Sequence, residues 1–196
     1  TPSVLLIYTG GTIGMIENPE TGALENFNFD HLLKHVPELK RFNYRISSYQ
    51  FNPPIDSSDM EPAYWAKLVK IINYNYDYFD GFVILHGTDT MAYTASALSF
   101  ALRNLSKPVI LTGSQKPLQS VRSDALQNLI TSIEIAGHSL YDIPLVPEVA
   151  IFFRDSLIRG NRARKNDATN YFGFSSPNFQ PLGEVGAEIK ISRNIS

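Results

Sequence analysis

Apolar and polar positions alternate along this chain in blocks of two lengths. Short apolar runs rich in β-branched residues are each followed by polar or glycine-containing residues, and longer segments of helical period separate them. This alternation is typical of a parallel sheet with helices on both faces. We therefore predict an α/β fold with a doubly wound, mostly parallel sheet flanked by helices in three Rossmann-like layers. The expected strands are Ser3–Tyr8, Arg45–Phe51, Gly81–Leu85, Pro108–Leu111 and Val149–Phe153.

Three apolar stripes between these runs predict helices that pack on the sheet. They comprise Trp65, Leu68, Val69, Ile72, Tyr76 and Phe79, then Met91, Ala95, Leu98, Leu102 and Leu105, and finally Leu126, Leu129, Ile130 and Ile133. Pro62 is typical of a first helical turn, which leaves Asp56-Ser-Ser-Asp59 in the preceding loop. Residues 17–28 contain Pro19, Gly22 and several amides, and we expect a mobile loop or hairpin that could serve as a lid.

Composition restricts the class of protein. With 196 residues, 43% hydrophobic and 18% charged, the chain is long enough for one well-packed domain. The net charge of −2 disfavours a nucleic-acid or membrane-surface partner and favours a small-molecule substrate. Because cysteine is absent, disulfides, a thiol nucleophile and cysteine metal sites are excluded.

Four polar segments directly follow expected strands: Thr9–Ile13, Asp56–Met60, His86–Thr90 and Thr112–Gln115. The carboxyl ends of strands in a doubly wound sheet open onto one crevice, so we expect these segments to converge. Each also has a structural explanation, since such residues often cap helices or make turns. The basic run Arg159–Lys165 could likewise be a solvated surface loop.

Several common motifs are missing from the chain. Thr9, Gly11 and Gly14 supply only two of the three glycines of a dinucleotide fingerprint, and no P-loop run occurs. His31 and His35 lack the glutamate and third ligand of a zinc site, and no Gly-x-Ser-x-Gly elbow accompanies His86. We therefore expect neither a cofactor nor a metal.

Taken together, five segments resemble the bacterial-type L-asparaginases, particularly the cytoplasmic type I branch. They are Thr9-Gly-Gly-Thr-Ile13, Asp56-Ser-Ser-Asp-Met60, His86-Gly-Thr-Asp-Thr-Met91, Thr112-Gly-Ser-Gln115 and Arg159-Gly-Asn-Arg162, in the family's order over nearly the whole chain. The resemblance implies hydrolysis of L-asparagine to L-aspartate and ammonia through an acyl-enzyme on a threonine, with L-glutamine as the other candidate substrate. It also implies a cytoplasmic homodimer or homotetramer that needs no cofactor.

The resemblance assigns roles to individual residues. It places the nucleophile at Thr12 and an activating group at Thr88, Asp89 and Lys165. The positions that match the family's contacts to the substrate's amino and carboxylate groups are Asp56, Ser57, Ser58 and Asp89, and Thr88 and Ser114 are the other expected substrate-binding residues. Backbone N–H groups on glycine turns can hold a developing oxyanion, and we expect such a donor near Thr12 or Ser114. Lys165 either takes the proton itself or orients Thr88 while a water carries it.

By the same resemblance, residues 1–182 form an amino-terminal catalytic domain, and 183–196 begin a linker toward a smaller carboxyl-terminal domain. We expect poor activity from the first domain alone. The family often carries a tyrosine in the mobile loop, whereas Gly22-Ala-Leu24 has none.

Two alternative functions are a non-catalytic amino-acid-binding module and the amidohydrolase subunit of a tRNA-dependent amidotransferase. A cluster of Tyr171, Phe172, Phe174 and Phe179 predicts either core or an interface.

Overall fold

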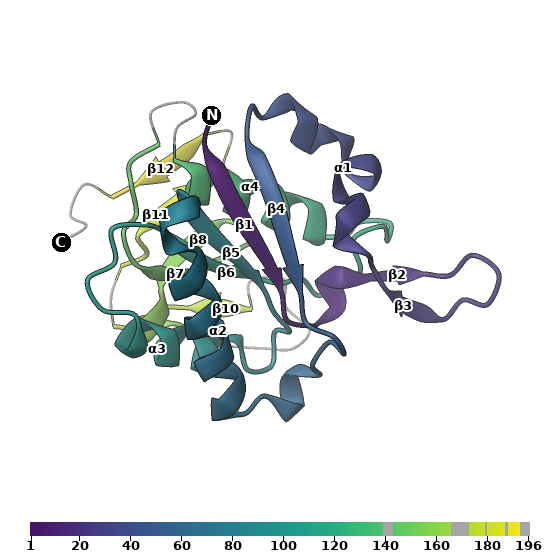
Figure 1. Cartoon of the computed structure of the whole chain (residues 1–196), viewed down its shortest axis with the longest axis horizontal. Coiled ribbons are helices and arrows are strands. Elements are labelled where there is room, and N and C mark those ends of the chain that lie inside the picture. Colours follow the sequence, from purple (N-terminus) through teal and green to yellow (C-terminus); the bar gives the residue numbers. More distant parts are fainter. Residues whose placement is uncertain (139–142, 166–172, 179, 187, 193–196) are drawn as a thin grey trace.

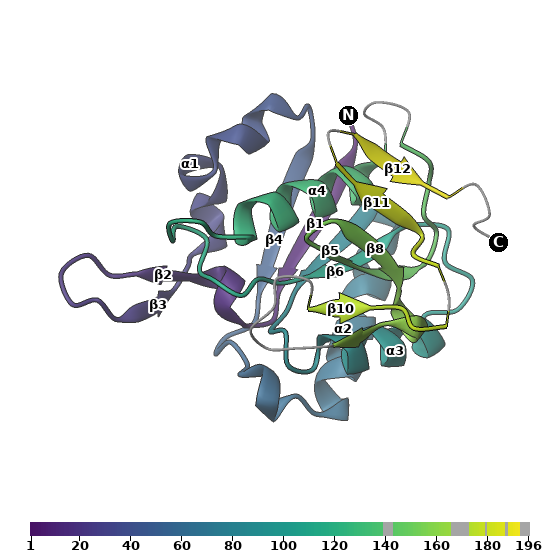
Figure 2. The ribbon, with the colours of Figure 1, turned by 180° about the vertical axis from the view of Figure 1, so that it is seen from behind.

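The computed structural model describes residues 1–138, 143–165, 173–178, 180–186 and 188–192. Its centre is an eight-stranded sheet in the order β12-β11-β8-β7-β6-β5-β1-β4. Helices lie on both faces, as the two opposite views show (Figures 1 and 2). The predicted three-layer α/β fold is confirmed.

The parallel part of the sheet contains all five expected strands. They are β1 (Ser3–Tyr8), β4 (Arg45–Gln50), β5 (Gly81–Leu85), β6 (Val109–Thr112) and β7 (Val149–Phe153). β1 lies between β4 and β5, so the chain moves outward to β4 and then back across β1 to β5. That reversal is the topological switch point, where ligands of open α/β sheets bind at the carboxyl ends of the strands.

The helices divide between the two faces of the sheet. They are α1 (Leu32–His35), α2 (Pro62–Asn75), α3 (Met91–Ala101) and α4 (Ala125–Gly137). Successive residues of a strand point to opposite faces, so Leu6 packs in a core with α1 and α4, whereas Ile7 packs in a core with α2 and α3. The three predicted helical stripes therefore face the sheet. None of the helices in the described residues combines the length and apolar character needed to cross a membrane.

The segment after β1 forms a hairpin that projects from the body of the molecule (Figures 1 and 2). It consists of β2 (Met15–Glu17) and β3 (Leu24–Asn26), paired antiparallel. Asn18 holds its tip, since its side-chain oxygen accepts from Glu20 N at 2.9 Å and its amide donates to Glu25 at 2.8 Å. The hairpin expectation is confirmed, and its action as a lid stays a prediction.

Short antiparallel strands that the apolar runs did not predict complete the fold. β8 (Ser156–Arg159), β11 (Gly183–Val185) and β12 (Ile189–Ile191) extend the sheet beyond β7, and β9 (Arg164–Lys165) pairs with β10 (Phe174–Ser175). The described residues of 183–196, expected as linker, thus form an edge of the sheet, and the domain boundary itself stays a prediction. Phe174 is buried against Phe153, with ring centroids 5.0 Å apart. Tyr171, Phe172 and Phe179 lie outside the described residues.

Candidate active site

The turns after β1 and β5 touch backbone to backbone. Gly11 adopts φ 94°, in the region that favours glycine, and a Cβ there would lie 2.5 Å from the Gly87 nitrogen. A Cβ at Gly10 would lie 1.9 Å from the Ile55 carbonyl oxygen, so the turn after β1 also contacts the loop after β4. Thr12 and Thr88 each directly follow one of the two touching glycines.

The other two loops join the same contact. A Cβ at Gly87 would lie 2.4 Å from the Ser57 Cβ, and one at Gly113 would lie 2.4 Å from the His86 carbonyl oxygen. Real side-chain carbons essentially never approach atoms this closely, so glycine is required at both positions. The four polar segments predicted to converge therefore do so.

Thr12 begins a single 3₁₀ turn, Thr12–Gly14, at the carboxyl end of β1. Gly14 N donates to the Gly11 carbonyl oxygen at 3.2 Å and closes the turn. The Thr12 side chain is half-buried, and the described residues offer its hydroxyl no hydrogen-bond partner. A threonine in this position is held by its backbone while its oxygen remains available to a ligand.

Lys165 reaches the turn after β5 and contacts two predicted site residues. Its Nζ donates to Asp89 Oδ1 at 2.7 Å and to Thr88 Oγ1 at 3.3 Å. The Lys165 side chain is 18% exposed and that of Asp89 is 65% exposed, so the ammonium is more enclosed than its carboxylate partner. Thr88, Asp89 and Lys165 form one hydrogen-bonded group.

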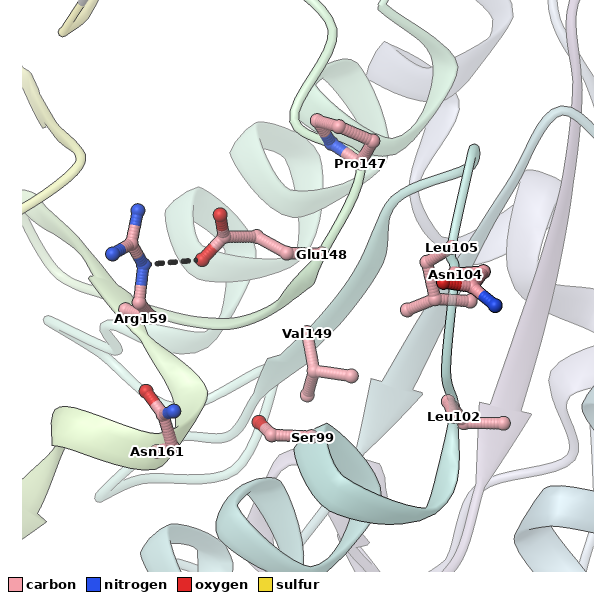
Figure 3. Close-up of a pocket in the computed structure, with 9 residues that line it drawn as sticks. All are labelled: Ser99, Leu102, Asn104, Leu105, Pro147, Glu148, Val149, Arg159 and Asn161. Atoms are coloured by element: carbon pink, nitrogen blue, oxygen red, sulfur yellow. Dashed lines mark hydrogen bonds and ion pairs between the residues drawn. The ribbon is translucent and has the colours of Figure 1, made fainter. Parts of the chain in front are cut away.

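The chain that leads to Lys165 packs closely on α3 at Gly160, while Asn161, Arg162 and Arg164 are exposed. Arg159 Nε donates to Glu148 Oε1 at 2.7 Å beside a hollow of about 490 Å³ (Figure 3). Gly160 then packs so tightly on α3 that a Cβ would lie 2.8 Å from Ser99 Oγ. From there the chain runs along α3 to Asp89. The hollow lies at the amino end of β7, away from the converging turns, so we do not take it as the active site.

The loop after β4 contains a buried serine between two exposed residues. Ser57 Oγ accepts a hydrogen bond from Thr90 N at 2.9 Å. Its own proton can go to Gly87 O, at 3.1 Å, and Thr90 Oγ1 also lies within hydrogen-bond distance, at 2.8 Å. The Ser57 hydroxyl thereby ties this loop to the next one. Asp56 is exposed and accepts from both the N–H and the hydroxyl of Ser58, which lowers the pKa of its carboxyl. An ionised carboxylate is thus presented at the rim of the crevice.

A buried histidine is hydrogen-bonded to the turn that carries Thr88. His86 Nδ1 lies 2.7 Å from Gly87 O and Nε2 lies 2.8 Å from Thr94 Oγ1. Since a carbonyl can only accept, Nδ1 carries the proton. Trp65 Nε1 donates to the same Thr94 oxygen at 2.9 Å. Complete burial lowers the pKa of His86 to about 4, so the ring is neutral and positions the turn.

Two polar residues near the start of α4 hold the loop after β6. Asn128 is fully buried, and its amide donates to Gly113 O at 2.8 Å while its oxygen accepts from Arg154 N at 2.8 Å. The Asp124 carboxylate accepts from Gln115 N at 3.0 Å. Ser114 is buried, and its hydroxyl donates to Lys116 O at 2.5 Å, so any ligand contact from Ser114 would use its backbone.

The structure also locates the two histidines considered as metal ligands. His35 contacts the Phe27 ring at 5.2 Å and bonds the Gln119 amide at 3.3 Å, while His31 ends a short 3₁₀ turn. No cluster of three or more His, Asp or Glu side chains that could hold a metal occurs in the described part of the chain.

Sequence reasoning missed the supporting roles of Asn128, Thr94 and Trp65. A polar side chain inside an apolar helical stripe, as at Asn128, was the available signal.

Comparisons with known proteins agree with this arrangement. The family model described as "Asparaginase, N-terminal" matches residues 3–196. L-asparaginase 1 of Escherichia coli K12 is 46% identical over 189 residues, covering 96% of this chain and 54% of that protein. A glutamyl-tRNA(Gln) amidotransferase component of Thermococcus kodakarensis is 39% identical, covering 97% and 43%. The crystal structure of L-asparaginase I from Vibrio cholerae matches with a TM-score of 0.87 and 45% identity, covering 100% and 57%. The chain thus spans about half the length of these relatives.

Proposed function

Because this chain belongs to the asparaginase family, whose amino-terminal domain it matches, we propose that the protein hydrolyses L-asparagine to L-aspartate and ammonia. One observation carries the proposal: Lys165 Nζ bonds both Thr88 Oγ1 and Asp89 Oδ1 on a turn that touches the Thr12 turn. A binding module needs no second threonine bonded to a lysine and an aspartate. A two-step acyl transfer can use such a group, because protons must move when the ester forms and again when it is hydrolysed.

In the first step, Thr12 Oγ1 attacks the carboxamide carbon of the substrate and loses its proton. The carbon–nitrogen bond then breaks, and ammonia leaves after it gains a proton, which leaves an ester on Thr12. In the second step, a water molecule attacks this ester, the bond between its carbonyl carbon and Thr12 Oγ1 breaks as that oxygen regains a proton, and aspartate leaves. Backbone N–H groups near Thr12 or Ser114 hold the negative charge that develops on the carbonyl oxygen in both steps.

Lys165 acts in this scheme as an ammonium that orients its two partners. A lysine ammonium has three donors and no acceptor, and two of those donors are directed at Asp89 and Thr88. With its oxygen accepting from Lys165, the Thr88 hydroxyl can direct its own proton elsewhere, toward a water that relays it. The geometry therefore favours the orienting role over direct proton abstraction by Lys165.

The substrate's charged groups match residues at the rim of the crevice. Asp56 and Asp89 supply carboxylates for the amino group of the substrate, and both side chains are exposed. The Ser57 hydroxyl is already hydrogen-bonded within the protein. Ser57 and Ser58 would therefore bind the carboxylate of the substrate through backbone N–H groups. The projecting hairpin of residues 15–26 would cover the site as a lid. The protein would act in the cytoplasm as a homodimer or homotetramer.

Ammonia release from L-asparagine by the full-length protein tests the proposal. We expect turnover by the wild type and a loss of at least about 10³-fold with Thr12→Ala, because the variant lacks the hydroxyl that forms the ester. A Thr12→Ala enzyme that keeps its rate would remove the nucleophile assignment. Calorimetry that detects asparagine binding without ammonia over hours would instead support the amino-acid-binding module.

The match to a component of a tRNA-dependent amidotransferase suggests a second candidate. There the same chemistry would release ammonia only together with a partner protein and tRNA. Steady ammonia release by the purified protein without tRNA would exclude this candidate. We expect the same assay with the 196-residue chain alone to show much lower activity.

A further inference from the structure

Tyr8 is the last residue of β1, and its side chain is completely buried beneath the turn that carries Thr12. Its hydroxyl donates a 3.0 Å hydrogen bond to the Gly11 carbonyl oxygen. Its ring lies 4.9 Å from the Phe29 ring, and a Cβ at Gly14 would lie 2.2 Å from two of its ring carbons. The phenol therefore contacts the turn on both sides of Thr12.

The Gly11 carbonyl is the group that determines where this turn points. It accepts the bond that closes the turn across Thr12, from Gly14 N at 3.2 Å, and Tyr8 provides a second bond to the same oxygen. Single 3₁₀ turns have poor hydrogen-bond geometry, so a second donor adds substantial restraint. The Gly11 carbonyl and the Thr12 N–H also belong to one planar trans peptide group and point in opposite directions. A donor that holds the oxygen toward the core therefore directs the Thr12 N–H away from it.

We propose that Tyr8 is a positioning residue, whose hydroxyl sets the Gly11–Thr12 peptide and thereby aims both the Thr12 hydroxyl and the Thr12 N–H into the crevice. The inference rests on the proposed role of Thr12 and extends it to a residue that never touches the substrate. Phenylalanine would fill the same space without burying a polar atom, so packing alone does not explain the hydroxyl. Burial raises the pKa of Tyr8, so the hydroxyl remains a protonated donor throughout the working pH range.

Tyr8→Phe in the full-length protein tests this inference. We expect kcat for ammonia release to fall by about 10- to 100-fold while KM changes by less than about threefold, because misplacement of the nucleophile affects the reaction more than binding. The shape of the kcat–pH profile should not change, since Tyr8 does not titrate. Tyr76→Phe is the matched control, because its hydroxyl bonds Ser106 in the loop before β6, at the amino ends of the strands and away from the Thr12 turn. A Tyr8→Phe enzyme with wild-type kcat, whatever its melting temperature, would overturn the inference.

A second readout separates this inference from the proposed function. If the wild type releases no ammonia from asparagine or glutamine, the proposed function fails, and amide hydrogen exchange still reports on Tyr8. The Gly14 amide should exchange at least about tenfold faster in Tyr8→Phe, because its acceptor is less restrained. The Thr9 amide, which bonds Leu85 O at 3.0 Å, serves as the internal reference. Equal exchange of Gly14 in both proteins would overturn the inference independently of activity.

Discussion

Lys165 Nζ lies 2.7 Å from Asp89 Oδ1, although 76 positions separate the two residues in the chain. Because Asp89 is largely exposed, this ion pair contributes little to folding stability. Its importance is positional, since the same ammonium also bonds Thr88 Oγ1. The chain that leads to Lys165 is anchored on α3 at Gly160, and the ion pair holds the Lys165 ammonium at Asp89.

Lys165→Met should therefore reduce activity much more than stability. We expect kcat for ammonia release to fall by about 10²- to 10⁴-fold, as is typical when a group that assists proton transfer is lost. The free energy of unfolding should change by less than about 1 kcal/mol. Lys190→Met, at the exposed position of β12, is the control and should leave both quantities unchanged. A Lys165→Met enzyme within threefold of wild-type kcat would contradict the assignment.

Gly11→Ala should destabilise the protein, since the methyl group would lie 2.5 Å from Gly87 N at a residue with φ 94°. Backbone strain and overpacking together predict a loss of about 2 to 5 kcal/mol, measured by urea unfolding. Gly186→Ala provides the control, because a Cβ there meets nothing within 4 Å. Equal midpoints for the two variants would show that the turns after β1 and β5 are not in contact.

Most of the parallel sheet could be predicted because its strands are buried on both faces and form short, continuous apolar runs. β1 is an example, since Leu6 and Ile7 face different cores and both are completely buried. The strands beyond β7 could not be predicted this way. β8 has only two apolar residues between two polar ends, and β9 has only two residues. Their pairing depends on tertiary contacts rather than on local pattern.

The convergence of the site could be predicted, but its internal bonding could not. Strand ends placed the glycine turns and Thr88 at one edge of the sheet. Periodicity gave no indication that the Ser57 hydroxyl bonds Thr90 or that Asn128 reaches across to Gly113. Likewise, the basic run ending at Lys165 has the composition of a surface loop. It differs from one at Gly160, which packs on α3, and at Lys165, which bonds Thr88 and Asp89.

Asn128→Leu should loosen the loop after β6. The change removes a fully buried amide together with its two hydrogen bonds, one to the Gly113 carbonyl and one from the Arg154 N–H. We expect the unfolding free energy to fall by about 2 to 4 kcal/mol. Because Ser114 follows Gly113, the KM for asparagine should rise as well. Asn75→Leu removes one hydrogen bond, from the side-chain amide to the Ile71 carbonyl oxygen at the end of α2. It should lower the unfolding free energy by less than about 1 kcal/mol and leave KM unchanged. Unchanged stability in Asn128→Leu would contradict the bridging role.

His86 should make stability depend on pH below neutrality. Its pKa is about 4 in the folded protein, against an ordinary value of 6.5. Between these values the unfolded chain binds a proton that the folded protein does not, so stability is greatest above pH 6.5 and falls as the pH drops toward 4. The loss amounts to about 3 kcal/mol. In structural terms, protonating Nε2 removes the acceptor for Thr94 and places a charge in the core.

The contribution of His86 can be isolated by comparison with His86→Gln, which keeps one donor for Gly87 O and one acceptor for Thr94 but does not titrate. Urea unfolding from about pH 7.5 to about pH 4.5 should give a steeper loss of stability for the wild type than for the variant. Other carboxyl groups titrate in both proteins, so their effects cancel in the difference between the two curves. Parallel curves would mean that His86 is not held neutral by burial.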